Sequence, residues 1–199
     1  GEARPLGQIV RNPKYATAVI CGAIAYGTMA LVMTATPLAM AAKGLPFSDT
    51  VWVIQWHILG MYGPAFFTGH LIKRFGTLTI MSIGALLSGL CAVVNLTGET
   101  TGFIWLGLFA IGVGWNFLFT GATTLLTETY SEAEKARAQG FNDLMVFGGL
   151  AFAALMSGTM HYYLGWATLN AAMLAPPVLA LILIVWLRRA LTRESLAAA

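Results

Sequence analysis

The chain has 199 residues, of which 58% are hydrophobic and only 10% are charged, with a formal net charge of +3. A soluble globular domain carries about 25% charged residues, so this composition excludes an ordinary soluble protein and indicates a membrane protein. The positive charge does not indicate a nucleic-acid-binding protein, because the basic residues lie between apolar segments and form no patch. Cys21 and Cys91 lie inside apolar segments, where we interpret them as buried hydrophobic side chains rather than as a disulfide.

Apolar segments separated by short polar stretches follow one another along the chain: residues 15–40, 51–72, 77–96, 102–127, 139–161 and 167–187. About 20 apolar residues in a helix cross the ~30 Å hydrocarbon layer of a bilayer, and each segment meets that length. The pattern predicts an all-α polytopic membrane protein with six transmembrane helices in one domain, residues 15–187. We expect residues 1–14 to be a cytoplasmic linker inside a longer protein, and residues 188–199 to be a cytoplasmic tail.

Local signals predict where these helices are interrupted. Pro37 cannot donate a backbone hydrogen bond, so we expect it to interrupt the helix near the end of the first segment. The charged stretch 127–137 is expected to include a short helix at the membrane surface. Residues 162–166 are expected to form the turn between the fifth and sixth segments.

The basic residues predict the orientation of the chain in the membrane. Every lysine and arginine except Lys43 falls on one side of the six-helix arrangement. Basic residues are enriched in cytoplasmic loops, so this side and both chain ends are expected to face the cytoplasm. The expected location is the cell inner membrane, with the lipid bilayer as surroundings and no nucleic-acid partner.

The loop after the second segment, residues 69–76, has the sequence GHLIKRFG. It resembles the short cytoplasmic loop signature of the major facilitator superfamily: glycine, three residues, aspartate, arginine, any residue, glycine. Gly69, Arg74 and Gly76 match this signature, whereas Lys73 stands where the family usually has aspartate. The glycines permit a tight turn and close helix approach, and the arginine holds the loop at the inner headgroups.

The distribution of polar side chains over the segments extends this resemblance. The third and sixth segments contain no charged residue, whereas polar side chains lie in the other four: Tyr26, Thr34, Gln55, His57, Asn116, Thr120, Asn142 and Asp143. In the superfamily, helices three and six of each half face lipid and the other four border the central cavity. The chain thus resembles the C-terminal six-helix half of such a transporter. This implies two inverted three-helix repeats, with the N-terminal half of the same polypeptide as partner.

Within this superfamily, residues 33–40 (MTATPLAM), residues 55–57 (QWH) and residues 60–61 (GM) are similar to proteobacterial proteins assigned as riboflavin transporters. The resemblance implies secondary active or facilitative transport of a small polar organic solute, with riboflavin as a candidate, by symport or uniport and alternating access. It implies no cofactor and no metal.

The alternative is a membrane protein without transport activity, either an intramembrane hydrolase or a scaffold. Ser88 and Ser157 each precede a glycine, but neither lies in the glycine-x-serine-glycine context of such a hydrolase, and there is no H-E-x-x-H metal motif. We therefore expect that the protein is not an enzyme.

The residues expected to line a substrate cavity are polar or aromatic: Tyr26, Gln55, Trp56, His57, Asn116, Thr120 and Asn142. Gln55, Trp56 and His57 combine an aromatic ring, an amide and an imidazole, which could stack on and hydrogen-bond a flat heterocycle. Asn116 and Thr120 share one helix face, and an amide in hydrocarbon must be paired or must face a wet cavity. Both interpretations of Asn116 remain open at this point.

Two residues could bind or release a proton during transport, or act as a gate. His57 lies inside the second segment, where a histidine could relay a proton or simply be satisfied by a neighbouring helix. Asp143 lies near the cytoplasmic end of the fifth segment. There it could act as a gate, or it could instead stabilise the helix dipole or pair with Arg137.

Overall fold

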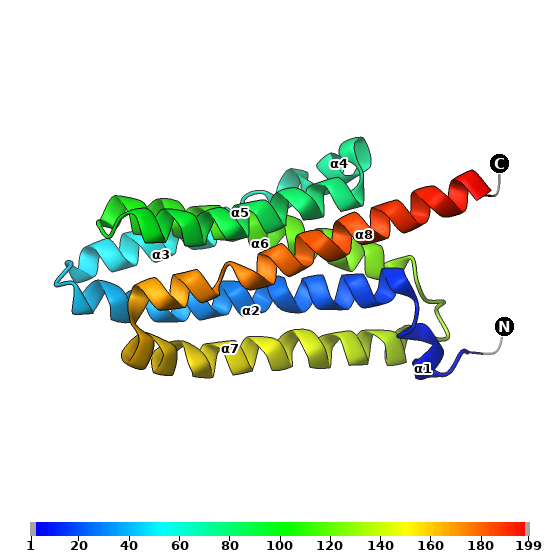
Figure 1. Cartoon of the computed structure of the whole chain (residues 1–199), viewed down its shortest axis with the longest axis horizontal. Helices are drawn as coiled ribbons and strands as arrows, with labels where there is room; N and C mark the ends of the chain where they lie inside the picture. Colours follow the sequence, from blue (N-terminus) through cyan, green and yellow to red (C-terminus); the bar gives the residue numbers. More distant parts are fainter. Residues whose placement is uncertain (1–2, 198–199) are drawn as a thin grey trace.

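The computed structural model of the chain describes residues 3–197; residues 1–2 and 198–199, at the outer ends of the predicted linker and tail, lie outside the described residues. Within them the structure is all-α, as predicted (Figure 1). The helices in chain order are α1 (Leu6–Ile9), α2 (Pro13–Ala42), α3 (Phe47–Tyr62), α4 (Ala65–Phe75), α5 (Thr77–Thr97), α6 (Thr101–Thr127), α7 (Lys135–Ala172) and α8 (Ala175–Ala197).

Several of these helices have the length and hydropathy of membrane-spanning helices. Within residues 3–197, four helical stretches are long and apolar enough: Pro13–Ala42, Thr77–Thr97, Thr101–Thr127 and Lys135–Ala197. The last contains 63 residues, about 95 Å of helix at 1.5 Å per residue, which is enough for two crossings. Helices α3 and α4, with 16 and 11 residues, are each shorter than one crossing needs. The count of six transmembrane helices therefore stays a prediction.

Proline residues act differently in the first and second apolar segments. The second segment breaks at Gly63 and Pro64, because proline removes a helix hydrogen bond and its ring collides with the carbonyl four residues earlier. By contrast, the expectation that Pro37 interrupts the first helix is wrong: α2 continues through it to Ala42. Ala35 and Thr36, which precede the proline, are buried, and the Thr36 hydroxyl donates to the Val32 carbonyl at 2.7 Å.

The connections on either side of α7 also differ from expectation. No helix forms between Glu128 and Glu134, so the surface helix expected there is absent, and the short helix near this end of the bundle is α1 in the linker. The turn expected at residues 162–166 contains Gly165, whose φ of 76° favours glycine, and Figure 1 shows the chain reversing direction there. A second interruption, at Met173 and Leu174, was not predicted.

The helices pack in a reciprocal pattern. Helix α2 packs against α7 and α6 packs against α3, while α2 and α6 also contact each other. Helix α5 packs on α6, α8 packs on α2, and α5 and α8 contact each other. We count α2, α3 with α4, and α5 as one three-helix group, and α6, α7 and α8 as the other. The first helix of each group then packs against the middle helix of the other group: α2 against α7, and α6 against α3. This is the arrangement that two inverted repeats would give.

Charged contacts divide the bundle into two ends. At one end, Lys14 forms an ion pair of 3.2 Å with Glu128, and Arg188 donates to the Thr79 hydroxyl at 3.0 Å. At the other end, Lys43 forms an ion pair of 2.6 Å with a glutamate in the α5–α6 loop. In Figure 1, α1, the start of α2 and the end of α8 lie together at the first end, on the right. The structure therefore places Lys43 apart from these basic residues, as the sequence predicted.

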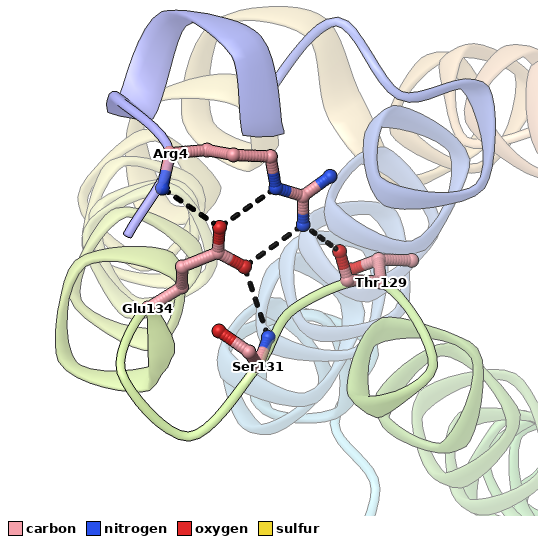
Figure 2. Close-up of polar contacts among 4 residues, drawn as sticks. All are labelled: Arg4, Thr129, Ser131 and Glu134. Carbon is pink, nitrogen blue, oxygen red and sulfur yellow. Dashed lines mark hydrogen bonds and ion pairs between the residues drawn. The ribbon is translucent and has the colours of Figure 1, made fainter. Parts of the chain in front are cut away.

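A hydrogen-bonded contact, which we call the linker clasp, ties the N-terminal segment to the α6–α7 loop (Figure 2). The Arg4 guanidinium donates to both carboxylate oxygens of Glu134, at 2.7 and 2.8 Å, and to the Thr129 carbonyl at 2.9 Å. The backbone N–H groups of Arg4 and Ser131 donate to the same carboxylate, each at 2.9 Å. These hydrogen bonds, above all those from the Arg4 side chain, hold the pKa of the Glu134 carboxyl well below its ordinary value.

Candidate substrate site

Aromatic side chains from four helices form one connected group, which we call the aromatic cluster: Tyr26 of α2, Tyr62 of α3, Trp115 and Phe119 of α6, and Phe147 of α7. Tyr26 lies edge-on to Trp115, Phe119 and Phe147, at ring-centre distances of 5.1, 4.7 and 5.7 Å. Tyr62 lies 5.9 Å from Trp115. These distances are those of favourable aromatic pairs, so the group joins α2, α3, α6 and α7 around one place.

The aromatic cluster has a buried base and an exposed rim. Trp115 is only 6% exposed, whereas Tyr62 and Phe147 are 58% and 51% exposed. The Trp115 Nε1–H group is buried without a hydrogen-bond partner among the described residues. A buried donor without a partner costs free energy, and a polar molecule could supply the acceptor once the side chains that cover the group move. The cluster therefore offers flat apolar faces together with a free donor.

Of the predicted cavity residues, Tyr26 is in the aromatic cluster, but residues 55–57 are not together. In a helix, successive side chains are about 100° apart, so three neighbours cannot share one face. Gln55 is exposed, and Trp56 packs in a second aromatic group with Trp105 and Phe109, at 5.9 and 6.1 Å. His57 is buried between α3 and α6. The structure therefore does not bring Gln55, Trp56 and His57 together, and their combined stacking site stays a prediction.

The predicted proton-handling residues lie in different surroundings. His57 Nδ1 lies 2.8 Å from the Leu108 carbonyl, so this nitrogen carries the proton and donates it to the carbonyl. Its Nε2 is buried without a partner among residues 3–197. Asp143 is exposed on α7, where the Asn142 amide donates to it at 3.2 Å. It lies one helical turn from Phe147 and thus on the same face as the aromatic cluster.

Asn116 pairs with neighbouring helices instead of facing open space. Its Nδ2 donates to the Met61 carbonyl at 2.8 Å, and the Thr68 hydroxyl donates to its Oδ1 at 2.6 Å. The Met61 carbonyl lies in the last turn of α3, where the break at Pro64 leaves carbonyl groups without helical partners. The Asn116 side chain thus supplies a hydrogen-bond donor to a backbone carbonyl at the α3–α4 break. Thr120, one turn further on, is half-buried.

The residues of the loop signature lie at the end of α4. Gly76 has a φ of 86°, a conformation that favours glycine, and it both ends α4 and precedes α5. Lys73 and Arg74 are exposed in the last turn of α4, and the Arg74 guanidinium lies 5.2 Å from the ring centre of Phe75. A Cβ added at Gly69 would meet nothing within 4 Å, so close helix approach does not require glycine there.

Two other features bear on the chemistry of the site. No group of three histidine, cysteine, aspartate or glutamate side chains suited to a metal ion occurs among the described residues.

A groove of about 620 Å³ opens between α2, α7 and the start of α8, and it is lined almost entirely by apolar side chains such as Ile24, Phe152 and Met173. This lining suits hydrocarbon rather than a polar solute.

Comparison with known proteins adds to this geometry. The model of the Major Facilitator Superfamily matches residues 18–198. The chain is 41% identical over 181 residues to the riboflavin transporter RfnT of Brucella anthropi, covering 91% of this chain and 45% of that protein. It is also 30% and 32% identical to YddS and YdeG of Bacillus subtilis, two uncharacterised MFS-type transporters, covering 84% and 80% of this chain but only 39% and 38% of them. The chain thus spans less than half the length of these relatives. The residues matched cover nearly the whole chain, which therefore belongs to the Major Facilitator Superfamily of transporters.

Proposed function

We propose that this chain is the C-terminal half of a secondary transporter that carries riboflavin, or a similar flat polar heterocycle, across the membrane by alternating access. The observation that carries the proposal is the aromatic cluster with its free Trp115 N–H group. The identity of 41% with a riboflavin transporter supports the choice of substrate. The chain's share of that protein, 45%, supports the assignment as one half.

The chemistry of the aromatic cluster suits such a substrate. A fused planar ring can stack on the exposed faces of Tyr62 and Phe147, each favourable aromatic pair adding about 0.5–1.5 kcal/mol beyond burial. The carbonyl and ring-nitrogen acceptors of a flavin would accept a hydrogen bond from the Trp115 indole. The cluster therefore supplies flat apolar area and oriented polar contact, the combination by which small-molecule sites gain specificity.

We further propose that Asp143, rather than His57, is the group that exchanges protons or acts as a gate. The His57 imidazole is buried between two helices and hydrogen-bonded to Leu108, so proton exchange would require α3 and α6 to separate. Asp143 is exposed and lies on the helix face that carries Phe147. A carboxylate in that position can respond both to solvent and to a bound substrate.

The arrangement in the membrane follows from the same proposal. Residues 1–14 form a linker from an N-terminal six-helix half, residues 15–187 form the transmembrane domain, and residues 188–199 form a tail. The end of the bundle that holds Lys14 and Arg188 faces the cytoplasm, in agreement with the preference of basic residues for that side.

The test is uptake of radiolabelled riboflavin by the full-length protein in vesicles, comparing Trp115→Phe with Trp105→Phe. Both tryptophans have a buried Nε1–H group without a partner among the described residues, but only Trp115 belongs to the aromatic cluster. Loss of one hydrogen bond of about 0.5–1.5 kcal/mol should raise the KM of Trp115→Phe about two- to thirteenfold. Trp105→Phe should leave KM unchanged.

Two results would contradict the proposal. Equal KM changes in the two variants would mean that the Trp115 indole makes no specific contact with substrate. A full-length protein that shows no saturable uptake of riboflavin would support the alternative of a membrane protein without riboflavin transport.

A further inference from the structure

The outward face of α8 carries a sequence of side chains that changes from apolar to basic. Ile182, Val185 and Trp186 are exposed, and they are followed on the same face by Arg189 and Arg193. Their spacing of three to four residues places them in one stripe along the helix. Together they line a hollow of about 470 Å³.

The opposite face of α8 accounts for its packing in the bundle. Ala180, Ile184 and Leu187 are buried there, and α8 contacts α2 and α5. Arg188 is exposed but lies on the side of α8 that faces α5, since its guanidinium donates to the Thr79 hydroxyl at 3.0 Å. The three arginines near the end of α8 therefore divide into one that contacts a neighbouring helix and two that face outward.

The two outward arginines have no carboxylate partner among residues 3–197. Neither Arg189 nor Arg193 forms an ion pair within 4.0 Å with any residue of the part of the chain that the structure describes. Glu194 lines a different hollow, which it shares with Arg11 and Lys14. Like charges four residues apart on a helix repel each other, so an anion between them would relieve a repulsion that the protein leaves in place.

We propose that this stripe binds an anionic phospholipid. The phosphate lies between Arg189 and Arg193, the Trp186 indole lies at the level of the headgroup and ester groups, and an acyl chain follows Val185 and Ile182. This order matches the layers of a bilayer, in which tryptophan favours the interface and arginine attracts anionic headgroups. From Ile182 to Arg189 the helix rises about 10 Å, so the stripe crosses from hydrocarbon to headgroups.

Charge at a helix end has simpler explanations, which cover only part of the observation. Cations near a helix C-terminus interact favourably with the helix dipole, and basic residues set membrane orientation. Either effect would be served by arginines on any face of α8. Neither explains why two unpaired arginines continue an exposed apolar stripe that contains a tryptophan.

The test uses the full-length protein in detergent, titrated with dioleoyl phosphatidylglycerol or dioleoyl phosphatidylcholine and measured by native mass spectrometry. The double variant Arg189→Gln/Arg193→Gln should lose at least fivefold in its preference for phosphatidylglycerol, because each arginine near an anionic headgroup contributes about a factor of five. The control Arg188→Gln removes one positive charge from the side of α8 that faces α5 and should keep the preference. Size-exclusion profiles of all variants establish that they are folded.

Three outcomes would overturn the proposal. The wild-type protein could bind both lipids equally well, or Arg188→Gln could lose as much preference as the double variant, which would reduce the effect to net charge. Inorganic phosphate at about 10 mM, added as a competitor, could displace phosphatidylglycerol completely; the site would then bind free anions instead of lipid.

Discussion

Two helix pairs occupy corresponding places in the bundle, α3 with α6 and α2 with α7, but they are packed very differently. In the α3–α6 pair, a Cβ atom added at Gly112 would lie 2.6 Å from the His57 carbonyl oxygen. In the α2–α7 pair, a Cβ atom added at Gly149 would lie 4.0 Å from Ala23, which is ordinary contact. Both pairs contain glycines, so glycine content alone does not indicate a tight interface.

Polar contacts follow the same division. The α3–α6 pair is connected within the bundle by His57 and Asn116, each hydrogen-bonded to a carbonyl of the other helix. The α2–α7 pair has one buried polar contact near its end, where the Tyr15 hydroxyl donates to the Ala138 carbonyl at 2.7 Å. The apolar groove of about 620 Å³ opens beside this second pair. We therefore expect α7 to move more easily against α2 than α3 moves against α6.

The largest expected difference is between Gly112→Ala and Gly149→Ala. Gly112→Ala forces a methyl group against backbone, so it should destabilise the protein by about 1–3 kcal/mol. Gly149→Ala has room and improves helix propensity, so its effect should lie between zero and about 1 kcal/mol of stabilisation. Thermal unfolding of the full-length protein in detergent measures both. Equal destabilisation by the two substitutions would remove the contrast between the pairs.

The protonatable residues of the two pairs should affect the pH dependence of uptake differently. If uptake is proton-coupled, it should change by up to about tenfold per pH unit in the wild-type protein, since the protonated fraction of one group can change that much. Asp143→Asn should flatten this dependence, and His57→Gln should keep its shape while lowering stability. Initial uptake rates between pH 5 and 8 provide the measurement. A flattened profile in His57→Gln alone would transfer the role back to the α3–α6 pair.

Asn116→Leu and Asn142→Leu compare an amide in each region. Asn116→Leu leaves the Met61 carbonyl without its partner and leaves the Thr68 hydroxyl with the Pro64 carbonyl alone. At about 0.6 kcal/mol for each contact between membrane helices, the loss should be about 1 kcal/mol. Among the described residues, the Asn142 side chain hydrogen-bonds only the neighbouring aspartate, at 3.2 Å, so its replacement should leave stability nearly unchanged. A larger loss in Asn142→Leu would show that α7 is held more firmly than its packing indicates.

The smallest effect is expected at the linker clasp, beside the start of α7. The folded-state pKa of Glu134 lies below its ordinary value, so the clasp contributes stability above the ordinary pKa and loses it as pH falls through the depressed one. A spin label at the exposed position Gly7 should therefore keep its mobility between pH 8 and 5. Glu134→Gln should increase that mobility at every pH.

The control for the clasp is Glu132→Gln, which removes an exposed carboxylate whose ion pair with Lys135 measures 3.5 Å. Surface ion pairs of this kind contribute little, so the label should not respond. A wild-type linker that loosens between pH 7 and 5 would contradict the depressed pKa of Glu134.

Sequence patterns were sufficient to predict the helical character and the apolar segments, because these depend on local composition and periodicity. They were not sufficient for the two prolines: Pro37 lies inside α2, whereas Pro64, next to Gly63, separates α3 from α4. A proline can be accommodated inside a helix or can end it, because tertiary context overrides local helix preference, and sequence alone does not contain that context.

The candidate site shows the same limit. Tyr26 could be selected as a polar aromatic residue in an apolar segment, but the cluster members Tyr62, Trp115 and Phe147 come from three other helices. The spacing of Trp115 and Phe119 by four residues was a usable signal for part of the cluster. No sequence signal predicted the direction in which the His57 side chain points, because that direction depends on which helix packs against α3.

The break at Gly63 and Pro64 has a mechanical consequence for the loop signature. Helix α4 is a short rod whose only buried residue is Thr68, which is hydrogen-bonded to Asn116 close to the break. A rod anchored near one end acts as a lever: from Pro64 to Arg74 its arm is about 15 Å, so a tilt of about 10° moves the basic tip by about 3 Å. The end of α4 that carries Lys73 and Arg74 can then move with the lipid headgroups or with a facing domain, while the α3–α6 interface on the other side of the break does not move.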